Sequence, residues 1–247
     1  MGRDDGRLND GKAATAPDEK PVKGDPHYRN HRQRLRERVL DSGPESLPDY
    51  ELLELLLFYS IERVDVKPLA KQLIADFGGF GGVLAASRHQ LEKYPRVTER
   101  TVVQFTAVRE AARRILRAEI ENKPVLSSWT QLLDYCRACL VDEQSEQFRV
   151  LYLNCKNILI ADEVQQRGTV DHTPVYPREV IKRALELGAT ALIMLHNHPS
   201  GDPTPSRADI DMTHEVRDAA QRLGISVHDH VIVGRDGVNS FRTMGLI

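Results

Sequence analysis

The residues with the clearest chemical potential lie in one stretch near the C-terminal end of the sequence. It reads HNHPSGDPTPSRAD over residues 196–209 and directly follows the apolar run 191–195. In an extended segment, side chains two positions apart share a face, so His196 and His198 point the same way. A Gly- and Pro-rich loop then turns the chain back, and Asp209 stands one turn into the next expected helix. Two imidazoles and a carboxylate are a natural ligand set for zinc, and three protein ligands leave a fourth position for water.

Each part of this pattern also has a structural explanation when it is taken alone. H-x-H pairs occur on polar strand faces, and Ser206-x-x-Asp209 is an ordinary capping-box-like helix start. The Pro and Gly residues of the loop are typical turn residues. The joint occurrence is far more specific, because the H-x-H pair, a spacer of seven residues and Ser-x-x-Asp follow one another in order.

The spacing H-x-H-x7-S-x2-D resembles the JAMM motif of the JAB/MPN metalloprotease superfamily. The segment HNHPSGDPTPSRAD, together with DHVIVG at 229–234, resembles the RadC branch of that superfamily, a branch long labelled as a DNA repair protein. In the first half, HRQRLRERVLDSGPESLPDYELLELLLF and KPLAKQLIADFG resemble the helical domain of RadC-like proteins. The resemblance covers about residues 27–247.

The resemblance implies a role for each matching residue. His196, His198 and Asp209 match the zinc ligands, which implies about one Zn²⁺ per chain. Ser206 matches the serine that helps to hold a developing oxyanion. The superfamily also needs a glutamate at the start of an early strand, where it orders the metal-bound water and acts as the general base.

Three glutamates compete for the role of the general base, namely Glu143, Glu146 and Glu163. The superfamily has a Glu just before an apolar strand, then a turn, a return strand, a helix and the H-x-H strand. Glu146, in the segment SEQFRV, fits that order, whereas Glu163 comes at the end of the return strand, one strand too late. The resemblance therefore favours Glu146, although spacing alone does not decide the choice.

These residues suffice for hydrolysis without any cysteine chemistry. Zinc lowers the pKa of a bound water from 15.7 to about 7. A carboxylate within reach takes the proton of that water and later delivers it to the leaving amine. A hydroxyl aimed at the oxyanion contributes about 3 kcal/mol. The function expected first is therefore zinc-dependent hydrolysis of a peptide or isopeptide bond, by a metallopeptidase whose substrate the sequence does not identify.

Two other functions fit part of the same pattern. One is a DNA-associated repair or recombination factor whose metal site is vestigial or structural. The other is a metal-dependent hydrolase that acts on a non-peptide bond, including a nuclease. A complete Glu/His/His/Asp/Ser set favours an enzyme over a vestigial site.

A run of arginines near the N-terminus bears on nucleic-acid binding. Within ten residues the sequence places Arg29, Arg32, Arg34, Arg36 and Arg38, opposed by Glu37. Clustered guanidinium groups on a helix can contact phosphates and release counterions. A solvated helix face is the alternative explanation for the same run.

RadC-like proteins often carry a helix-hairpin-helix turn whose glycines let the backbone approach DNA phosphate. The corresponding stretch here is residues 93–100, and Arg96 and Thr98 stand where the glycines would be. A backbone phosphate nest without glycine is disfavoured. The sequence therefore predicts a degenerate hairpin, which argues against DNA contact through its backbone.

Two further clusters are assigned structural roles. Cys136-x-x-Cys139 has no second pair to complete a zinc site, and one face of a core helix explains it. In His228-Asp229-His230, no carboxylate follows at the matching spacing. Asp229 and His230 are therefore expected to be structural or to support the metal ligands from behind.

The whole chain has the composition of a soluble globular protein. It has 247 residues, a net charge of −2, 40% hydrophobic and 28% charged residues, and three cysteines. This balance excludes a polycation, and the apolar runs are far shorter than the roughly 18 residues of a membrane span. The N-terminus lacks the apolar region of a secretory signal, and the few cysteines suit a reducing compartment. We therefore expect a cytoplasmic protein.

The pattern of elements predicts a mixed α/β (α+β) fold in two parts. Residues 1–26 are expected to be a disordered tail, residues 27–121 an all-helical domain, and residues 125–247 a sheet-and-helix domain of the JAB/MPN type. Ser46, Ser87, Thr98 and Ser128 are expected to begin helices in and after the first domain. The predicted strands are 148–153, a return strand at 158–160, 191–195, 225–233 and 240–241, with helices from Pro177 and from Ser206.

Overall fold

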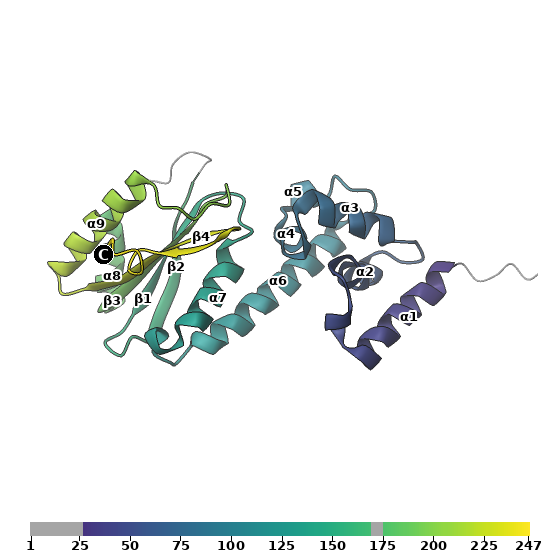
Figure 1. The fold of residues 1–247 in the computed structure, drawn as a ribbon, viewed down its shortest axis with the longest axis horizontal. Helices are drawn as coiled ribbons and strands as arrows, with labels where there is room; N and C mark the ends of the chain where they lie inside the picture. Colours follow the sequence, from purple (N-terminus) through teal and green to yellow (C-terminus); the bar gives the residue numbers. More distant parts are fainter. Residues whose placement is uncertain (1–26, 169–174) are drawn as a thin grey trace, which may run out of the picture.

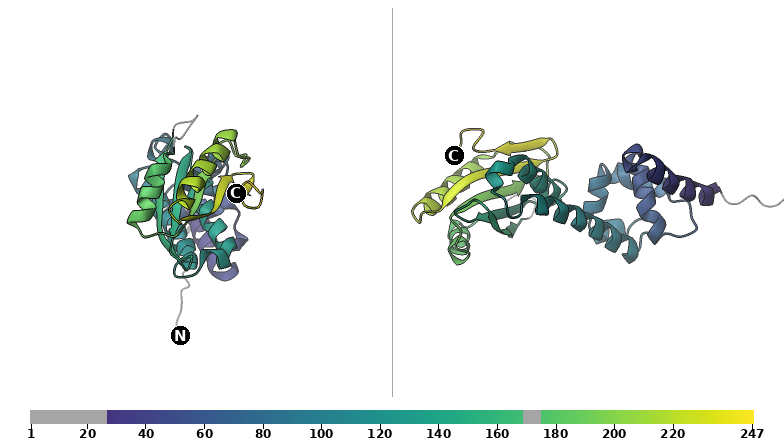
Figure 2. Two further views of the ribbon diagram at one scale, coloured as in Figure 1. Left: turned by 90° about the vertical axis from the view of Figure 1, so that its left-hand side faces the viewer. Right: turned by 90° about the horizontal axis from the view of Figure 1, so that it is seen from below.

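The computed structural model describes residues 27–168 and 175–247, so the expected disordered tail at residues 1–26 lies outside the described residues. A helical part and a sheet-containing part lie side by side along the long axis of the molecule (Figure 1). The long helix α6 (Glu99–Ile120) runs from one part to the other (Figures 1 and 2). This arrangement confirms the predicted mixed α/β fold with a helical N-terminal region.

The first part consists of short helices around a small apolar core. Before α6 it contains α1 (His27–Ser42), α2 (Asp49–Ser60), α3 (Lys67–Phe77), α4 (Phe80–Ala85) and α5 (Arg88–Leu91). Leu53, Leu57 and Leu73 are fully buried at its centre. Within the two described ranges, no helix combines the length and the apolar character that a membrane span requires.

The predicted helix starts differ in how well they match the structure. Ser87 begins α5 with a full capping box, in which its side chain accepts from the backbone of Gln90. The prediction for Ser46 is wrong. This serine ends a short 3-10 turn (Pro44–Ser46), and α2 begins at Asp49 behind Pro48. The Ser46 hydroxyl donates to the carbonyl of Gly43 instead, which closes the preceding turn.

Thr98 and Ser128 stand at the N-caps of their helices as expected. Neither side chain makes a capping hydrogen bond. The Ser128 hydroxyl donates to the carbonyl of Pro124 instead. The sequence therefore predicts where these helices begin better than it predicts which side chains cap them.

The second part is built on a five-stranded sheet in the order β2-β1-β3-β4-β5. Its strands are β1 (Gln147–Leu153), β2 (Leu159–Arg167), β3 (Ala191–Asn197), β4 (Ser226–Gly234) and β5 (Gly237–Ser240). β1 is antiparallel to both β2 and β3, and β4 is antiparallel to β5. β3 and β4 are parallel, and α9 (Arg207–Gln221) is the helix that connects them.

Helices cover both faces of this sheet (Figure 1). Leu192 and Met194 of β3 point toward α8 (Pro177–Glu186) and α9, whereas Ile193 and Leu195 point toward α7 (Trp129–Leu140). Because side chains alternate along a strand, His196 continues the row of Leu192 and Met194. The face that carries α8 and α9 is therefore also the face that carries the imidazole.

Helix α6 contributes to both cores. Phe105 is buried in the helical part, whereas Ile120 is fully buried in the core between the sheet and α7. The chain leaves the helix at residues 121–124, where the sequence places the boundary between the parts. The last turns of α6 nevertheless pack with the sheet.

Strand β2 is longer than expected, and strand β5 begins earlier than expected. The return strand β2 runs over Leu159–Arg167 rather than 158–160, and the last strand is Gly237–Ser240 rather than 240–241. β2 is an edge strand whose side chains are nearly all half-buried. The second half of β2 is polar, so it lacks the alternation of apolar and polar residues that identifies a strand from sequence. One consequence is that Glu163 lies in the middle of β2, not at its end.

Candidate metal centre

The structure brings His196, His198 and Asp209 together at the C-terminal end of β3. His196 is the last but one residue of the strand and is 1% exposed, and His198 directly follows the strand. Nε2 of His196 lies 2.9 Å from Nε2 of His198 and 3.3 Å from Oδ1 of Asp209. Nε2 of His198 lies 3.5 Å from Oδ2 of Asp209. These three side chains form a group that can hold a metal ion.

The geometry and donor types of this group fit zinc. Tetrahedral zinc with ligand bonds of about 2.0–2.1 Å has ligand atoms about 3.3–3.4 Å apart, close to the distances observed. Nδ1 of His198 lies 2.8 Å from the carbonyl of Asp202, so this ring nitrogen donates to it. A neutral His198 then presents only a lone pair at Nε2, and the carboxylate of Asp209 also only accepts. Acceptors that face one another so closely are stabilised by a metal ion or a proton between them.

For two of the three residues, the surroundings favour the protonation state that zinc binding needs. Burial lowers the pKa of His196 to about 4. Burial would raise the pKa of Asp209, but hydrogen bonds from His198 and Ser206 and the nearby His196 lower it below its usual range. The hydrogen bond with Asp209 raises the pKa of His198. Without a metal, His198 is therefore the residue that takes up a proton, and metal binding displaces that proton.

Ser206 orients Asp209 through a capping box at the start of α9. The Ser206 side chain accepts from the backbone N–H of Asp209. In return, Oδ2 of Asp209 accepts from the Ser206 backbone at 2.7 Å and from the Ser206 hydroxyl at 2.6 Å. The partial positive charge of the helix N-terminus stabilises the same carboxylate. The Ser206 hydroxyl donates to a ligand in this structure, so its role toward an oxyanion stays a prediction.

Glu146 directly precedes β1 and lies near the imidazoles. Phe148 of β1 pairs with His196 of β3, and Glu146 comes two residues before Phe148, just outside the strand. If the alternation of the strand continues to Glu146, its side chain lies on the face that carries His196. The negative charge of Glu146 also adds a smaller contribution, after Asp209 and Asp202, to the raised pKa of His198.

The two competing glutamates have other partners. Glu143 accepts from the guanidinium groups of Arg109 and Arg113 on α6. Glu163 accepts three hydrogen bonds from Arg183 on α8, which lower its pKa. Neither carboxylate is therefore directed at the imidazole pair.

Asn197, between the two histidines, has a role that sequence analysis did not assign. Its Oδ1 accepts from the backbone N–H of Gln147 at 2.8 Å, and its Nδ2 donates to the carbonyls of Glu143 and Ser145. The buried amide thereby fixes the backbone on both sides of Glu146. Its place between two predicted ligands was the only signal in the sequence.

His230 is a second residue behind the imidazole pair. Its Nε2 lies 2.7 Å from Nδ1 of His196, in agreement with a supporting role. Asp229 instead accepts from the Ser240 hydroxyl and from the backbone N–H of Arg242, which fixes the C-terminal segment. Cys136 and Cys139 are free and buried in the core beside α7.

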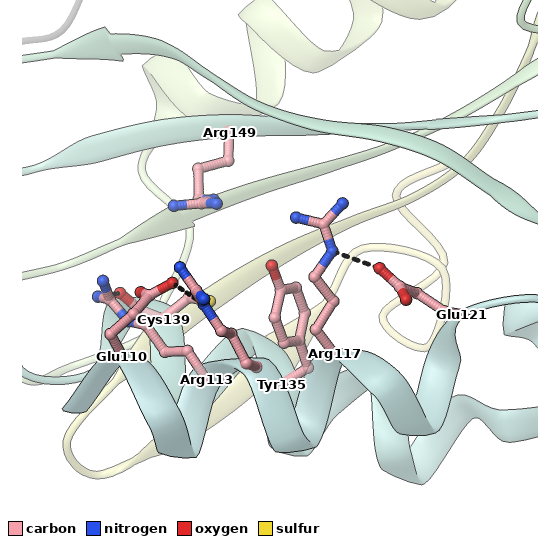
Figure 3. A pocket seen from close by; sticks show the side chains of 8 residues that line it. Glu110, Arg113, Arg117, Glu121, Tyr135, Cys139 and Arg149 are labelled. Carbon is pink, nitrogen blue, oxygen red and sulfur yellow. Dashed lines mark hydrogen bonds and ion pairs between the residues drawn. The ribbon is translucent and has the colours of Figure 1, made fainter. Parts of the chain in front are cut away.

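A separate pocket of about 480 Å³ lies between α6, α7 and β1. Arg149 extends from β1 toward the helices, and Arg117 extends from α6 toward the sheet beside Tyr135 (Figure 3). This pocket is on the α7 face of the sheet, opposite the face that carries the imidazoles. Its charges are paired, since Arg149 binds Asp162 through two hydrogen bonds and Arg117 binds Glu121. It is therefore not part of the candidate metal centre.

The arginine run on α1 is divided between contacts within the protein and solvent. Arg32 donates to three backbone carbonyls, and Arg38 pairs with Glu51. Arg34 and Arg36 are exposed. Arg29 lies outside the residues whose side chains the structure describes. Among the four arginines of the run whose side chains the structure describes, Arg32 and Arg38 thus have structural partners.

The predicted degenerate hairpin leads into the start of α6. Arg96 has a φ of 69°, the left-handed conformation that glycine favours. The turn therefore takes a glycine-like backbone with an arginine at this position. The absence of backbone contact between this turn and phosphate stays a prediction.

Comparison with known proteins agrees with this fold. A RadC-like JAB domain matches residues 126–246, and a UPF0758 N-terminal domain matches residues 28–103. The chain is 57% identical over 213 residues to a UPF0758 protein of Rhodobacter capsulatus, covering 86% of this chain and 100% of the relative. It is 54% identical over 221 residues to a UPF0758 protein of Ruegeria pomeroyi, covering 90% and 99%. The chain belongs to this UPF0758 family of RadC-like proteins.

Proposed function

We propose that this protein is a zinc-dependent hydrolase that cleaves a peptide or isopeptide bond. The observation that carries the proposal is the convergence of Nε2 of His196, Nε2 of His198 and the Asp209 carboxylate within a few ångströms. Three ligands that leave a fourth position open are typical of catalytic rather than structural zinc sites. A glutamate on the same strand face supplies the base that such a site needs.

The residues of the chain divide the work of hydrolysis. His196, His198 and Asp209 would hold the zinc ion, which supplies a water with a pKa of about 7 when bound. Glu146 accepts the proton of that water and delivers it to the leaving amine. Ser206 holds the Asp209 carboxylate in its binding orientation.

Metal analysis tests the first half of this proposal. Purified protein should contain about one zinc per chain, and the His196→Ala/His198→Ala double variant should contain almost none. An intact fold of the variant is checked by its helical circular dichroism. Equal metal in both proteins would refute the assignment of the ligands.

Metal removal tests the second half. The zinc-loaded protein should cleave members of a panel of peptides and isopeptides. The chelator-treated protein should not cleave them, and adding zinc back should restore cleavage. Cleavage that survives chelation would show that the bond is broken by other means.

Nucleic-acid association is a second proposal, and the exposed Arg34 and Arg36 of α1 support it. Each phosphate neutralised on duplex DNA contributes about −0.9 to the slope of log K against log salt. Replacing both arginines by Ala should therefore flatten the slope by roughly two units if each contacts one phosphate. Absence of binding at low salt would remove this proposal.

A further inference from the structure

A row of buried polar side chains runs from His196 back to the start of α9. Nδ1 of His196 lies 2.7 Å from Nε2 of His230, and Nδ1 of His230 lies 2.6 Å from the Thr213 hydroxyl. The Thr213 hydroxyl in turn donates to the backbone carbonyl of Asp209 at 2.6 Å. His196 is 1% exposed, and His230 and Thr213 are 0% exposed. The row thus begins at one candidate ligand and ends on the backbone of another.

Local structure explains why these side chains meet. Thr213 is four residues after Asp209 on α9, so its hydroxyl reaches the carbonyl one turn back. His230 of β4 pairs with Met194 of β3, whose side chain points to the α9 face. β3, β4 and α9 therefore each contribute one member of the row.

The direction of each hydrogen bond follows from the backbone carbonyl of Asp209, where the row ends. A carbonyl oxygen only accepts, so the single Thr213 proton is used on Asp209. The Thr213 oxygen must then accept from Nδ1–H of His230. Ionising a fully buried imidazole is costly, so His230 carries one ring proton and its Nε2 accepts. That nitrogen accepts from Nδ1–H of His196.

The opposite direction leaves a repulsive contact. If Thr213 donated to His230, the Thr213 oxygen and the Asp209 carbonyl would face each other at 2.6 Å without a proton between them. Two buried acceptors at that distance would lose a hydrogen bond and repel each other. The row therefore has one favourable arrangement of protons.

Aromatic packing keeps the rings of the row in place. Phe148 stacks on His196 with ring centres 6.3 Å apart and an interplanar angle of 23°. Phe241 covers His230 with ring centres 4.6 Å apart. With these neighbours, neither imidazole can rotate without displacing an aromatic ring of the core.

We propose that Thr213 and His230 are positioning residues that hold His196 as the Nδ1–H tautomer, with the lone pair of Nε2 turned toward His198 and Asp209. The inference rests on the proposed function only in treating His196 as a metal ligand. Because the row ends on the backbone of Asp209, it also fixes the relative placement of two ligands. Partners of this kind affect metal affinity about 10- to 100-fold.

The tautomers can be observed directly in the metal-free protein. Nitrogen-15 NMR of the imidazole rings should show Nδ1–H and a bare Nε2 for both His196 and His230 in the wild type. Thr213→Val keeps the shape of the side chain but removes the hydroxyl, so it should shift the ring signals of both histidines. Thr213→Ser should restore the wild-type pattern. A wild-type His196 protonated at Nε2 would overturn the proposal without any variant.

Zinc affinity gives a second measurement, by competition of the full chain with a chelator of known affinity. Thr213→Val should weaken zinc binding by about 10- to 100-fold, and Thr213→Ser should stay near the wild-type value. Thr101→Val is the matched control, because Thr101 is also 0% exposed and its hydroxyl donates to Ser60 in the helical part. That control should leave zinc affinity unchanged.

The two measurements separate this proposal from the proposed function. Unchanged tautomers and unchanged zinc affinity in Thr213→Val overturn the positioning role while the zinc site stands. A wild-type protein that binds no zinc overturns the proposed function, whereas the tautomers of the metal-free protein still decide the positioning role.

Discussion

Asn197 lies between two candidate ligands in the sequence, yet its side chain serves a third residue. It points to the α7 face, opposite to His196, and its amide bonds to the backbone of Glu143, Ser145 and Gln147. The backbone on both sides of Glu146 is thus held by the Asn197 amide, which bonds to backbone groups. Because the positioning group, Asn197, and the proposed base, Glu146, are different residues, a variant of Asn197 tests positioning alone.

Replacing Asn197 by Ala should leave the zinc content unchanged and lower the rate of hydrolysis by about tenfold or more. The reason is that a base displaced by about 1 Å can cost up to 10²-fold in rate. Asn154→Ala is the control, since Asn154 also accepts from backbone N–H groups but lies beyond the opposite end of β1. If both variants keep full activity, Asn197 does not position the base.

The sequence predicted the grouping of His196, His198 and Asp209 because they lie close together in the chain and follow a specific spacing. It predicted Glu146 only through a family resemblance, since 50 residues separate it from His196. Thr213 and Asn197 were not predicted, because each has a partner on an element distant in the sequence. The rings of His230 and His196 meet across two parallel strands, and nothing in the local sequence of either residue encodes that contact.

Among the elements, α1 shows how a charged run can serve packing. Arg32 donates to the carbonyl of Phe58 in the last turn of α2, where carbonyls lack helical partners, and to the carbonyls of Ile61 and Val64 just after the helix. The guanidinium also lies 4.5 Å from the centre of the Phe58 ring. A residue expected to contact phosphate therefore caps a neighbouring helix.

Arg32→Ala should lower the free energy of unfolding by about 2–3 kcal/mol, because hydrogen bonds from a charged group are worth roughly that much. Arg36→Ala, on the same helix but exposed, should change it by less than about 0.5 kcal/mol. Urea unfolding followed by circular dichroism measures both. Equal effects would mean that the Arg32 contacts add nothing to stability.

The mistakes at the level of elements have local causes. Ser46 has the side chain of a helix cap, but Pro44 and Pro48 shape the backbone around it into a turn before α2 begins. The second half of β2 is polar and half-buried at the edge of the sheet, so its sequence shows no apolar alternation.

In the whole molecule, one helix belongs to two cores. Phe105 of α6 packs in the helical part, and Leu116 and Ile120 pack against the core of the sheet part. At about 1.5 Å per residue, a helix of this length spans about 33 Å, enough to link both parts (Figure 2). The sequence pattern changes at residues 122–124. The packing of the sheet part nevertheless begins earlier in the chain, in the last turns of α6.

Ile120→Ala should therefore destabilise the sheet part by about 2–4 kcal/mol, as expected for a buried aliphatic side chain. Ile115→Ala is the control on the same helix, because Ile115 is 67% exposed, and its effect should stay within about 0.5 kcal/mol. Hydrogen exchange resolves which part opens first. Loss of protection confined to α1–α5 in Ile120→Ala would contradict a shared core.

The central claim is that Glu146 acts as the base beside a zinc ion held by His196, His198 and Asp209. The most direct measurement compares zinc content and the rate of peptide or isopeptide hydrolysis in the wild type, Glu146→Gln and Glu163→Gln. Glu146→Gln should keep about one zinc per chain and lose about 10²- to 10⁴-fold in rate, because an amide cannot accept the proton. Glu163→Gln, which alters the contact with Arg183, should keep both. A zinc-loaded Glu146→Gln protein with wild-type activity, or an inactive zinc-loaded Glu163→Gln protein, would contradict the account.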